Sequence, residues 1–386
     1  MRLDELRAGD LDVRTSFALS YRALRVEDAR VFRLLGLLPG ATFALDLVAA
    51  VVQMDRDAAE RALERLCHAQ LVRAVDAESY SLHDLVRLFS RERLVAEEPA
   101  RASDDALERA LGWYVESAHG AAKRLRRPGG GEVTVVNPHE STTDAKQTAL
   151  AHFELEWSNL VQAVTRAAEL ERWDVVRELG DALHTFFAIQ QHWSEEEHVM
   201  RLGWHAAREL ADRRPESRFL SYLATLCHDQ GRWQEAASFY EDSLGISRSL
   251  DDRHGEAWAL HGLGGVHRRR GELDRAHRCQ ESSVAIFREL ADREGEGRAL
   301  NGLGLVLSNQ ERLAEAAGCY ERSLHLLLEV GDRHSALYPL CNLADHLCSS
   351  GRHEAAAARF EQHLAICDEL RDRDCAVWSL SGLARV

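Results

Sequence analysis

A repeat of 40 residues recurs at least four times in the second half of the chain, and this feature constrains the fold more than any other. Four short segments introduce the copies: Gly231-Arg232-Trp233, Gly271-Glu272-Leu273, Glu311-Arg312-Leu313 and Gly351-Arg352-His353. Downstream columns also agree, with alanine at 236, 276, 316 and 356 and an acid-Arg pair between successive copies. Fixed self-similarity at this period is typical of a solenoid, in which each unit stacks on the next.

Each repeat has the pattern of a helical hairpin. The inward-facing positions of one copy fall on a single stripe of each of two helices: Leu260, Leu263, Val266 and His267, then Ala276, Gln280, Val284 and Phe287. Gly264 and Ala276 are small, which lets the two helices approach closely. A single hairpin cannot bury both of its faces, so the repeats must stack on one another.

Composition places the chain among helical proteins without a membrane-spanning segment. It has 386 residues, 45% of them hydrophobic, and only six prolines, which fits two or three packed, mainly all-α units. No apolar run reaches the roughly 18 residues of a membrane span, and no apolar signal segment opens the chain. We therefore expect a cytoplasmic protein with no membrane partner.

Cysteines and histidines give no clear metal or cofactor site. The eight cysteines occur singly inside helical patterns, and Cys279 and Cys319 share a repeat column, so they fit small core residues of an intracellular protein. Two groups of possible metal ligands are Cys341, His346 and Cys348, and His192, His198 and His205. The first matches no zinc spacing and the second does not share one helix face. We expect no metal and no cofactor.

Charge and motifs argue against an enzyme and against a general nucleic-acid binder. The formal net charge is −15, whereas contact with phosphates requires a positive surface. The sequence has no nucleophile elbow, no zinc-binding helix motif and no dinucleotide-binding glycine pattern. We therefore expect a non-enzymatic protein without a catalytic residue.

The first hundred residues predict a compact winged-helix unit. Helices are expected over Val13 to Leu24, Val26 to Gly36, Leu45 to Val52, Asp57 to Ala69 and His83 to Ala96. Between the last two helices, the segments Leu71 to Val75 and Tyr80 to Leu82 predict a hairpin around a polar turn. Helices followed by a two-stranded wing are typical of a winged-helix domain.

Four segments of this unit carry a family resemblance: Phe17 to Leu24, Ala29 to Gly36, Pro39-Gly40 and Tyr80 to Phe89. They resemble the winged helix of bacterial STAND regulators of the NB-ARC type, which are common among AfsR/SARP-like transcriptional regulators. Phe153 to Val161 is similar to the family's link into its repeats. In that family an ATPase core precedes the winged helix, and tetratricopeptide repeats follow as a right-handed superhelical sensor.

The resemblance implies the following domains: a winged helix over 1–98, a connector over 99–149 with an exposed loop near 127–144, degenerate repeats over 150–215, and tetratricopeptide repeats over 216–386. No phosphate-binding loop of the G-x-x-x-x-G-K-[ST] kind is present. We therefore expect the C-terminal part of a longer regulator, with an ATPase core as its partner in the parent protein and an incomplete last repeat.

The segment of degenerate repeats is rich in aromatic residues. They are Trp157, Trp173, Phe186, Phe187, Trp193 and Trp204. We interpret them as packing anchors rather than as a ligand cage.

His83 and Asp84 match the His-Asp of the family's MHD-type motif, with Leu82 in place of Met. The resemblance implies a nucleotide-sensing role for the pair in a full-length parent. In this chain the simpler interpretation is that Asp84 caps or precedes the closing helix and that His83 is a solvated residue at the helix start.

DNA binding through the helix Asp57 to Ala69 is an alternative. The arginines Arg56, Arg61 and Arg65 are offset by neighbouring acidic residues, whereas a DNA-reading helix presents an uncompensated basic face. We do not expect DNA binding, although a stand-alone DNA-binding regulator and a passive assembly scaffold remain the competing functions.

The candidate ligand site is the concave surface lined by the first helix of each repeat. The positions around the Leu-Gly or Leu-Ala step that should face this groove are Trp258, His261, Arg268, Arg298, Asn301, Tyr338, Asn342 and Asp345. Arginine and asparagine side chains can hold a peptide backbone or carboxylate, and the aromatic rings can cover apolar side chains. We therefore expect a protein, a peptide or a small inducer as the partner.

Overall fold

A computed structural model of the chain describes residues 7–8, 11–125, 144–187, 192–370 and 373–386, and nearly all of its regular structure is helical. The chain divides into two compact units. One consists of residues 1–121 and 152–183, and the other of residues 122–151 and 184–386. The predicted mainly all-α fold is confirmed.

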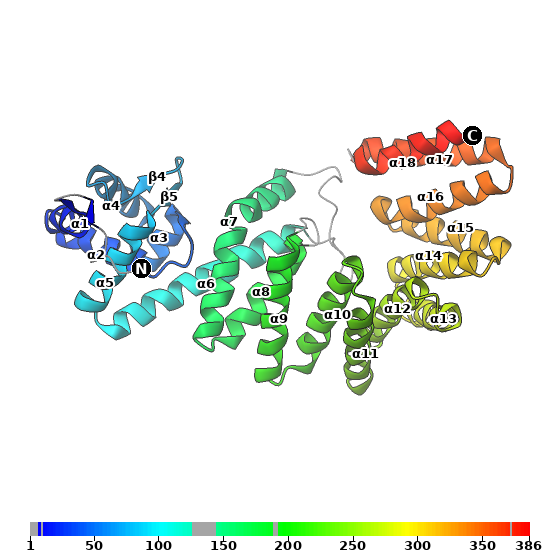
Figure 1. Cartoon of the computed structure of the whole chain (residues 1–386), viewed down its shortest axis with the longest axis horizontal. Coiled ribbons are helices and arrows are strands. Elements are labelled where there is room, and N and C mark those ends of the chain that lie inside the picture. Colours follow the sequence, from blue (N-terminus) through cyan, green and yellow to red (C-terminus); the bar gives the residue numbers. More distant parts are fainter. Residues whose placement is uncertain (1–6, 9–10, 126–143, 188–191, 371–372) are drawn as a thin grey trace. The chain divides into compact units, whose positions relative to one another are not determined.

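The first unit begins with a winged helix (Figure 1). Its elements are β1 (Arg7–Ala8), β2 (Leu11–Asp12), α1 (Val13–Arg22), α2 (Val26–Leu35), β3 (Thr42–Ala44), α3 (Leu45–Val52), α4 (Arg56–His68), β4 (Arg73–Ala74), β5 (Ser79–Ser81) and α5 (Asp84–Glu97). β3, β5 and β4 form one antiparallel sheet in that order, and Phe43 pairs with Tyr80. The predicted helices and hairpin are present, and β3 is an addition that the sequence pattern did not indicate.

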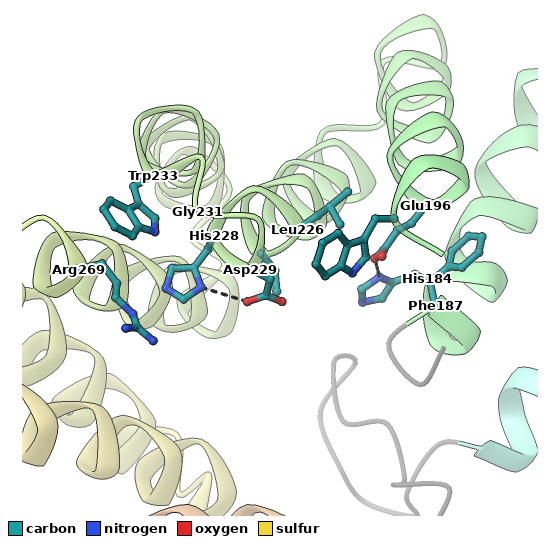
Figure 2. Close-up of a pocket in the computed structure, with 11 residues that line it drawn as sticks. His184, Phe187, Glu196, Leu226, His228, Asp229, Gly231, Trp233 and Arg269 are labelled. Atoms are coloured by element: carbon teal, nitrogen blue, oxygen red, sulfur yellow. Dashed lines mark hydrogen bonds and ion pairs between the residues drawn. The ribbon is translucent and has the colours of Figure 1, made fainter. Parts of the chain in front are cut away.

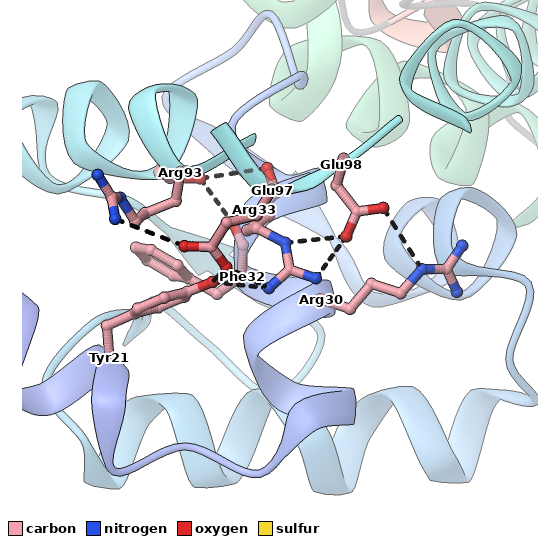
Figure 3. Close-up of polar contacts among 8 residues, drawn as sticks. Tyr21, Arg30, Phe32, Arg33, Arg93, Glu97 and Glu98 are labelled. Carbon is pink, nitrogen blue, oxygen red and sulfur yellow. Dashed lines mark hydrogen bonds and ion pairs between the residues drawn. The ribbon is translucent and has the colours of Figure 1, made fainter. Parts of the chain in front are cut away.

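A polar network joins α1, α2 and α5 beside their aromatic core (Figure 3). Arg33 donates hydrogen bonds to the Tyr21 hydroxyl at 2.6 Å and, through Nε, to Glu98 at 2.8 Å. The Tyr21 hydroxyl donates to Glu97 at 2.6 Å. Tyr21 also packs against Phe32, with ring centroids 5.7 Å apart. The three helices are therefore held together by aromatic packing and by charged hydrogen bonds.

Three longer helices follow the winged helix in sequence. They are α6 (Ala100–Leu125), α7 (Asp144–Glu169) and α8 (Trp173–Phe187). Within the first unit, Tyr114 of α6 is fully buried, and this burial raises the pKa of its hydroxyl. Arg109 of α6 donates from Nη2 to the carbonyl of Val51 at 2.8 Å, which ties this helix to α3.

The second unit continues as consecutive hairpins (Figure 1). We call the first helix of each 40-residue repeat its A helix and the second its B helix. The helices are α9 (Trp193–Glu209), α10 (Arg213–Asp229), α11 (Trp233–Ser249), α12 (Arg253–Arg269), α13 (Leu273–Glu289), α14 (Arg293–Asn309), α15 (Leu313–Glu329), α16 (Arg333–Ser349), α17 (His353–Leu370) and α18 (Arg373–Arg385). The A helices are α10, α12, α14, α16 and α18.

The inward stripes predicted for the hairpin of α12 and α13 are buried. Phe287 and Ala276 are fully excluded from solvent, and Gln280 is 1% exposed. A Cβ atom on Gly264 would lie 2.5 Å from the side chain of Gln280. Close approach of the two helices therefore requires a residue without a side chain at Gly264.

The acid-Arg pairs between repeats have a defined structural role. The aspartates cap the A helices: Asp252 accepts from the Gly255 amide at 3.0 Å, Asp292 from the Gly295 amide at 2.9 Å, and Asp332 from the Ser335 amide at 3.0 Å. Each following arginine pairs with a glutamate 36 residues later, at the end of the next B helix: Arg253 with Glu289, Arg293 with Glu329, and Arg333 with Glu369. The linker therefore starts the A helix and ties it to the end of the B helix of the same repeat.

The turns between A and B helices use the left-handed backbone region. Gly231 and Gly271 both have φ of 76°, and Gly351 has φ of 71°. Glycine adopts this conformation without steric cost. Glu311 occupies the equivalent turn with φ of 62°, so one repeat makes the same turn with a side chain present.

Candidate functional site

One column of the repeat lies on the A helices and carries either an arginine or an aromatic residue in each copy. Its members are Arg218, Trp258, Arg298, Tyr338 and Trp378, one on each A helix. We call these residues, together with the other predicted groove positions on α12, α14 and α16, the A-helix surface. Tyr338 is 53% exposed and Trp378 is 66% exposed. Large exposed aromatic rings on successive helices are available for contact with a partner.

Trp258 forms the centre of one cluster on this surface. The guanidinium carbon of Arg298 lies 5.8 Å from the centre of the Trp258 ring, within the range of a cation–π contact. The indole nitrogen of Trp258 donates to Nε2 of His254 at 3.2 Å, and its ring meets Phe287 edge-on at 5.0 Å. Two of the predicted groove residues therefore contact each other directly.

His261 is held beside this cluster by Gln280. Its Nδ1 lies 3.0 Å from Oε1 of Gln280, and Nε2 of Gln280 donates to the His261 carbonyl oxygen at 3.0 Å. Burial lowers the pKa of the His261 imidazole, and the hydrogen bond to Gln280 only partly opposes this effect. The ring is therefore neutral at pH 7 and is fixed in one orientation.

Other predicted groove residues tie neighbouring A helices together. Asn342 donates to Asn301 at 3.0 Å, and Arg385 pairs with Asp345 at 2.8 Å. Arg298 reaches Asp332, the cap of the next A helix, at 3.1 Å. A ligand that binds these polar groups must therefore replace the hydrogen bonds and ion pairs that they already make.

Arg268 and Tyr338 lie apart from these ties. Arg268 is in the last turn of α12, where burial lowers the pKa of its guanidinium. Tyr338 packs edge-on against His334, with ring centroids 5.7 Å apart. The eight predicted residues thus share three successive A helices, and Tyr338 is the most accessible of them.

A cavity of about 530 Å³ in the second unit was not predicted from the sequence (Figure 2). Its lining includes His184 from the last turn of α8, Glu196 of α9 and Asp229 at the end of α10. Trp193 and Trp233 also line it and are 45% and 39% exposed. Trp193, which the sequence indicates as a packing anchor, thus also borders a cavity.

Glu196 is the most perturbed acid in this cavity. It is 8% exposed, and burial together with the nearby Asp229 raises its pKa to about 7. Nδ1 of His184 lies 3.9 Å from its carboxylate, and the His184 ring stacks on Tyr222 with centroids 3.4 Å apart. The cavity therefore contains a carboxyl group that changes its charge near neutral pH.

His83 is the N-cap of α5, and Asp84 is the first residue of that helix. Nδ1 of His83 accepts a hydrogen bond from the Leu85 amide at 3.3 Å. His83 and Cys67 both border a second cavity of about 310 Å³ in the winged helix. The side chain of His83 is exposed, as the helix-start interpretation expects, and its nucleotide-sensing role stays a prediction for a longer parent protein.

The arginines of α4 are engaged by acidic residues of the same unit. Arg65 makes a double hydrogen bond to the buried Asp28, at 2.7 and 2.8 Å. Arg56 pairs with Asp46 at 2.9 Å and with Glu78 at 2.6 Å. These pairs reduce the positive charge that α4 presents to a nucleic acid.

Among the residues that the structure describes, no group of three or more His, Cys, Asp or Glu side chains is placed to hold a metal ion. All eight cysteines are free thiols. Burial raises the pKa of the Cys341 thiol to about 11, which fits an unreactive packed side chain. No helix in the described part of the chain is both long and apolar enough to cross a membrane.

Comparison with known proteins identifies the repeats and a relative. The tetratricopeptide repeat family model matches residues 216–289 and 295–369. The regulatory protein AfsR of Streptomyces griseus is 33% identical over 251 residues, and the regulatory protein AfsR of Streptomyces coelicolor is 32% identical over 242 residues. The chain contains tetratricopeptide repeats and is similar to AfsR over 61% of its length. The expected resemblance to AfsR-like regulators is confirmed.

The match to AfsR covers 61% of this chain and 24% of each AfsR protein. The chain therefore spans about a quarter of the length of the curated relatives it matches. Among solved structures, the apo form of RapI has a TM-score of 0.50 at 13% identity, covering 78% of this chain and 76% of RapI. At that identity the similarity shows the fold alone.

Proposed function

We propose that this chain is a non-enzymatic regulatory segment whose A-helix surface is a sensor. The surface binds a protein or peptide, with a small inducer as a second ligand class. In a longer cytoplasmic parent protein, binding shifts the population between closed and open arrangements of a STAND-type ATPase core. His83 and Asp84 sense the nucleotide in that parent, and residues 216–386 recognise the ligand.

The observation that carries the proposal is the row of arginine and aromatic side chains along successive A helices. Stacked repeats present an extended surface rather than a closed pocket, which suits a peptide or protein segment. Aromatic and arginine residues contribute most of the binding energy at protein interfaces. The 33% identity to a protein named as regulatory supports a signalling role.

The test is a selection from a displayed library of random peptides against the whole chain, followed by titration of the selected peptide. Tyr338→Ala removes an exposed ring from the A-helix surface and leaves the core intact. We expect the variant to bind the peptide roughly tenfold more weakly, as truncation of a hot-spot aromatic does.

Leu313→Ala is the matched control. Leu313 is 43% exposed at the start of the B helix α15, outside the A-helix surface. Unchanged binding by this variant, together with weaker binding by Tyr338→Ala, supports the proposal. A selection that yields no peptide, or equal binding by the two variants, excludes the A-helix surface as the recognition site.

A further inference from the structure

The 40-residue register extends backward to the hairpin that precedes the clear repeats. α8 begins at Trp173 and α9 at Trp193, each 40 residues before the start of α10 and α11. His184 then falls in the column of Ala224, Gly264, Gly304, Ala344 and Ala384. Glu196 falls in the column of Ala236, Ala276, Ala316 and Ala356. In this hairpin the two columns that hold small residues in the other repeats hold a histidine and a glutamate.

This replacement buries the carboxyl group of Glu196 without the hydrogen bonds that would offset its loss of hydration. The 3.9 Å between His184 Nδ1 and the Glu196 carboxylate is longer than a hydrogen bond. The described residues give the Glu196 carboxylate no hydrogen bond, although its residue is more than nine-tenths buried. A buried carboxylate without such partners is unfavourable for folding, because it loses its hydration. Packing alone therefore does not explain a glutamate in a column of alanines.

The cavity beside Glu196 has the size and lining of a small-molecule site. Its volume of about 530 Å³ lies within the usual range for ligand pockets. Trp193 belongs to the apolar lining. Trp233 and Phe187 supply further apolar walls, while Glu196 and Asp229 supply two carboxyl groups (Figure 2). Such a combination of aromatic faces and acids matches an organic cation.

The other ionisable side chains that line the cavity are compatible with a cationic ligand. Nδ1 of His228 lies 3.1 Å from Asp229, and the buried Nε2 of His228 has no hydrogen-bond partner in the described part of the chain. Arg269 is an exposed side chain at the end of α12 and is the one guanidinium among the lining residues. Two carboxyl groups face the cavity, so an ammonium is bound more favourably than an anion.

We propose that this cavity binds a small primary amine that carries an aromatic group. Glu196 and Asp229 accept hydrogen bonds from the ammonium, and Trp193 and Trp233 pack against the aromatic body. None of the eight predicted groove residues lines the cavity. Amine binding in the cavity and peptide binding at the A-helix surface therefore use different residues and can be tested separately.

The experiment compares 2-phenylethylamine with the uncharged 2-phenylethanol, of similar size, using the whole chain at pH 8. Binding is followed by tryptophan fluorescence and by calorimetry. The amine should bind saturably and at least about tenfold more tightly than the alcohol, since a charge-assisted hydrogen bond is present only with the amine. Phenylacetate serves as the anionic comparison and should bind more weakly than the amine.

Two variants locate the site. Glu196→Gln removes the negative charge at constant volume and should weaken amine binding about tenfold. Glu196→Ala places the residue of the repeat column at this position, which keeps the variant foldable, and should weaken binding at least as much. The matched control is Glu195→Gln on the same turn of α9, because Glu195 does not line the cavity.

Each outcome decides the inference. Tight amine binding that falls in both Glu196 variants and persists in Glu195→Gln supports it. Equal binding of the amine and the alcohol, tighter binding of phenylacetate, an equal loss in the Glu195 control, or no saturable binding at all overturns it. Circular dichroism of each variant separates loss of the site from loss of the fold.

Discussion

Glu311 shows how a single residue can depart from its repeat without changing the turn. It has φ of 62° where the equivalent turns carry Gly231, Gly271 and Gly351. A residue with a Cβ atom in the left-handed region is strained by roughly 1 kcal/mol. We expect Glu311→Gly to raise the free energy of unfolding by about 0.5 kcal/mol, because relief of strain exceeds the added chain entropy of glycine.

Chemical denaturation of the repeats measures this effect. Glu321→Gly is the control, since Glu321 lies in the interior of α15 and is exposed. There the same substitution should destabilise the protein by about 1 kcal/mol. If both variants are destabilised equally, the strain at Glu311 is absent.

The buried carboxyl group of Glu196 makes the free energy of unfolding depend on pH. Its pKa in the folded state is raised from 4.5 to about 7 by burial and by Asp229. The folded state therefore holds a proton that the unfolded state has already released, and stability falls as pH rises from about 4.5 through about 7. At pH 8 this loss amounts to at most about 3 kcal/mol.

Glu196→Ala removes that loss, so its stability relative to the parent chain should increase between pH 5 and pH 8. Taking the difference between the two proteins at each pH cancels the titration of groups that do not interact with Glu196. Urea denaturation at both pH values provides the measurement. Parallel pH profiles for the two proteins would contradict a raised pKa at Glu196.

At the scale of elements, Arg33 connects three helices of the winged helix. Its side chain is 11% exposed and that of Glu98 is 6% exposed. Removal of one partner of a buried ion pair leaves the other charge without compensation. Arg33→Met should therefore destabilise the first unit by about 3 kcal/mol, measured as a lower thermal midpoint of that unit.

Arg30→Met is the matched substitution on the same helix. Arg30 is 43% exposed and lies 3.9 Å from Glu98, so its contribution should stay below about 1 kcal/mol. The repeats have their own core, and their thermal transition should be unchanged in both variants. A loss of equal size in the two variants would show that Arg33 has no special role.

Helices and their buried faces can be predicted from the sequence where the hydrophobic pattern recurs over several copies. Leu260 and Phe287 mark helical stripes that recur over several copies, and both are buried as predicted. β3 escaped prediction because Thr42 to Ala44 is too short for an alternating pattern and is fixed only by pairing with β5, which is distant in sequence. The network around Arg33 also joins residues more than 60 positions apart, so no local pattern reveals it.

For the molecule as a whole, the repeat register reflects both the solenoid and the position of the cavity. The register predicts the solenoid and places Trp258, Arg298 and Tyr338 on successive A helices. It also contains the signal for the cavity, since Glu196 interrupts a column of alanines. That signal becomes visible only when the register is continued into the segment where helical repeats look degenerate. The ion pairs that occupy the A-helix surface depend on rotamers, which no sequence column specifies.

The ion pair within each repeat has a consequence for how such an array changes over generations. Each link uses one aspartate that starts a helix and one arginine that reaches a glutamate 36 residues later. In three successive copies both partners lie within the same copy, so duplication or loss of one of these copies in the gene keeps each remaining arginine with its glutamate. Whole copies can thus be added or removed without breaking a link, whereas an insertion between an arginine and its glutamate separates that pair.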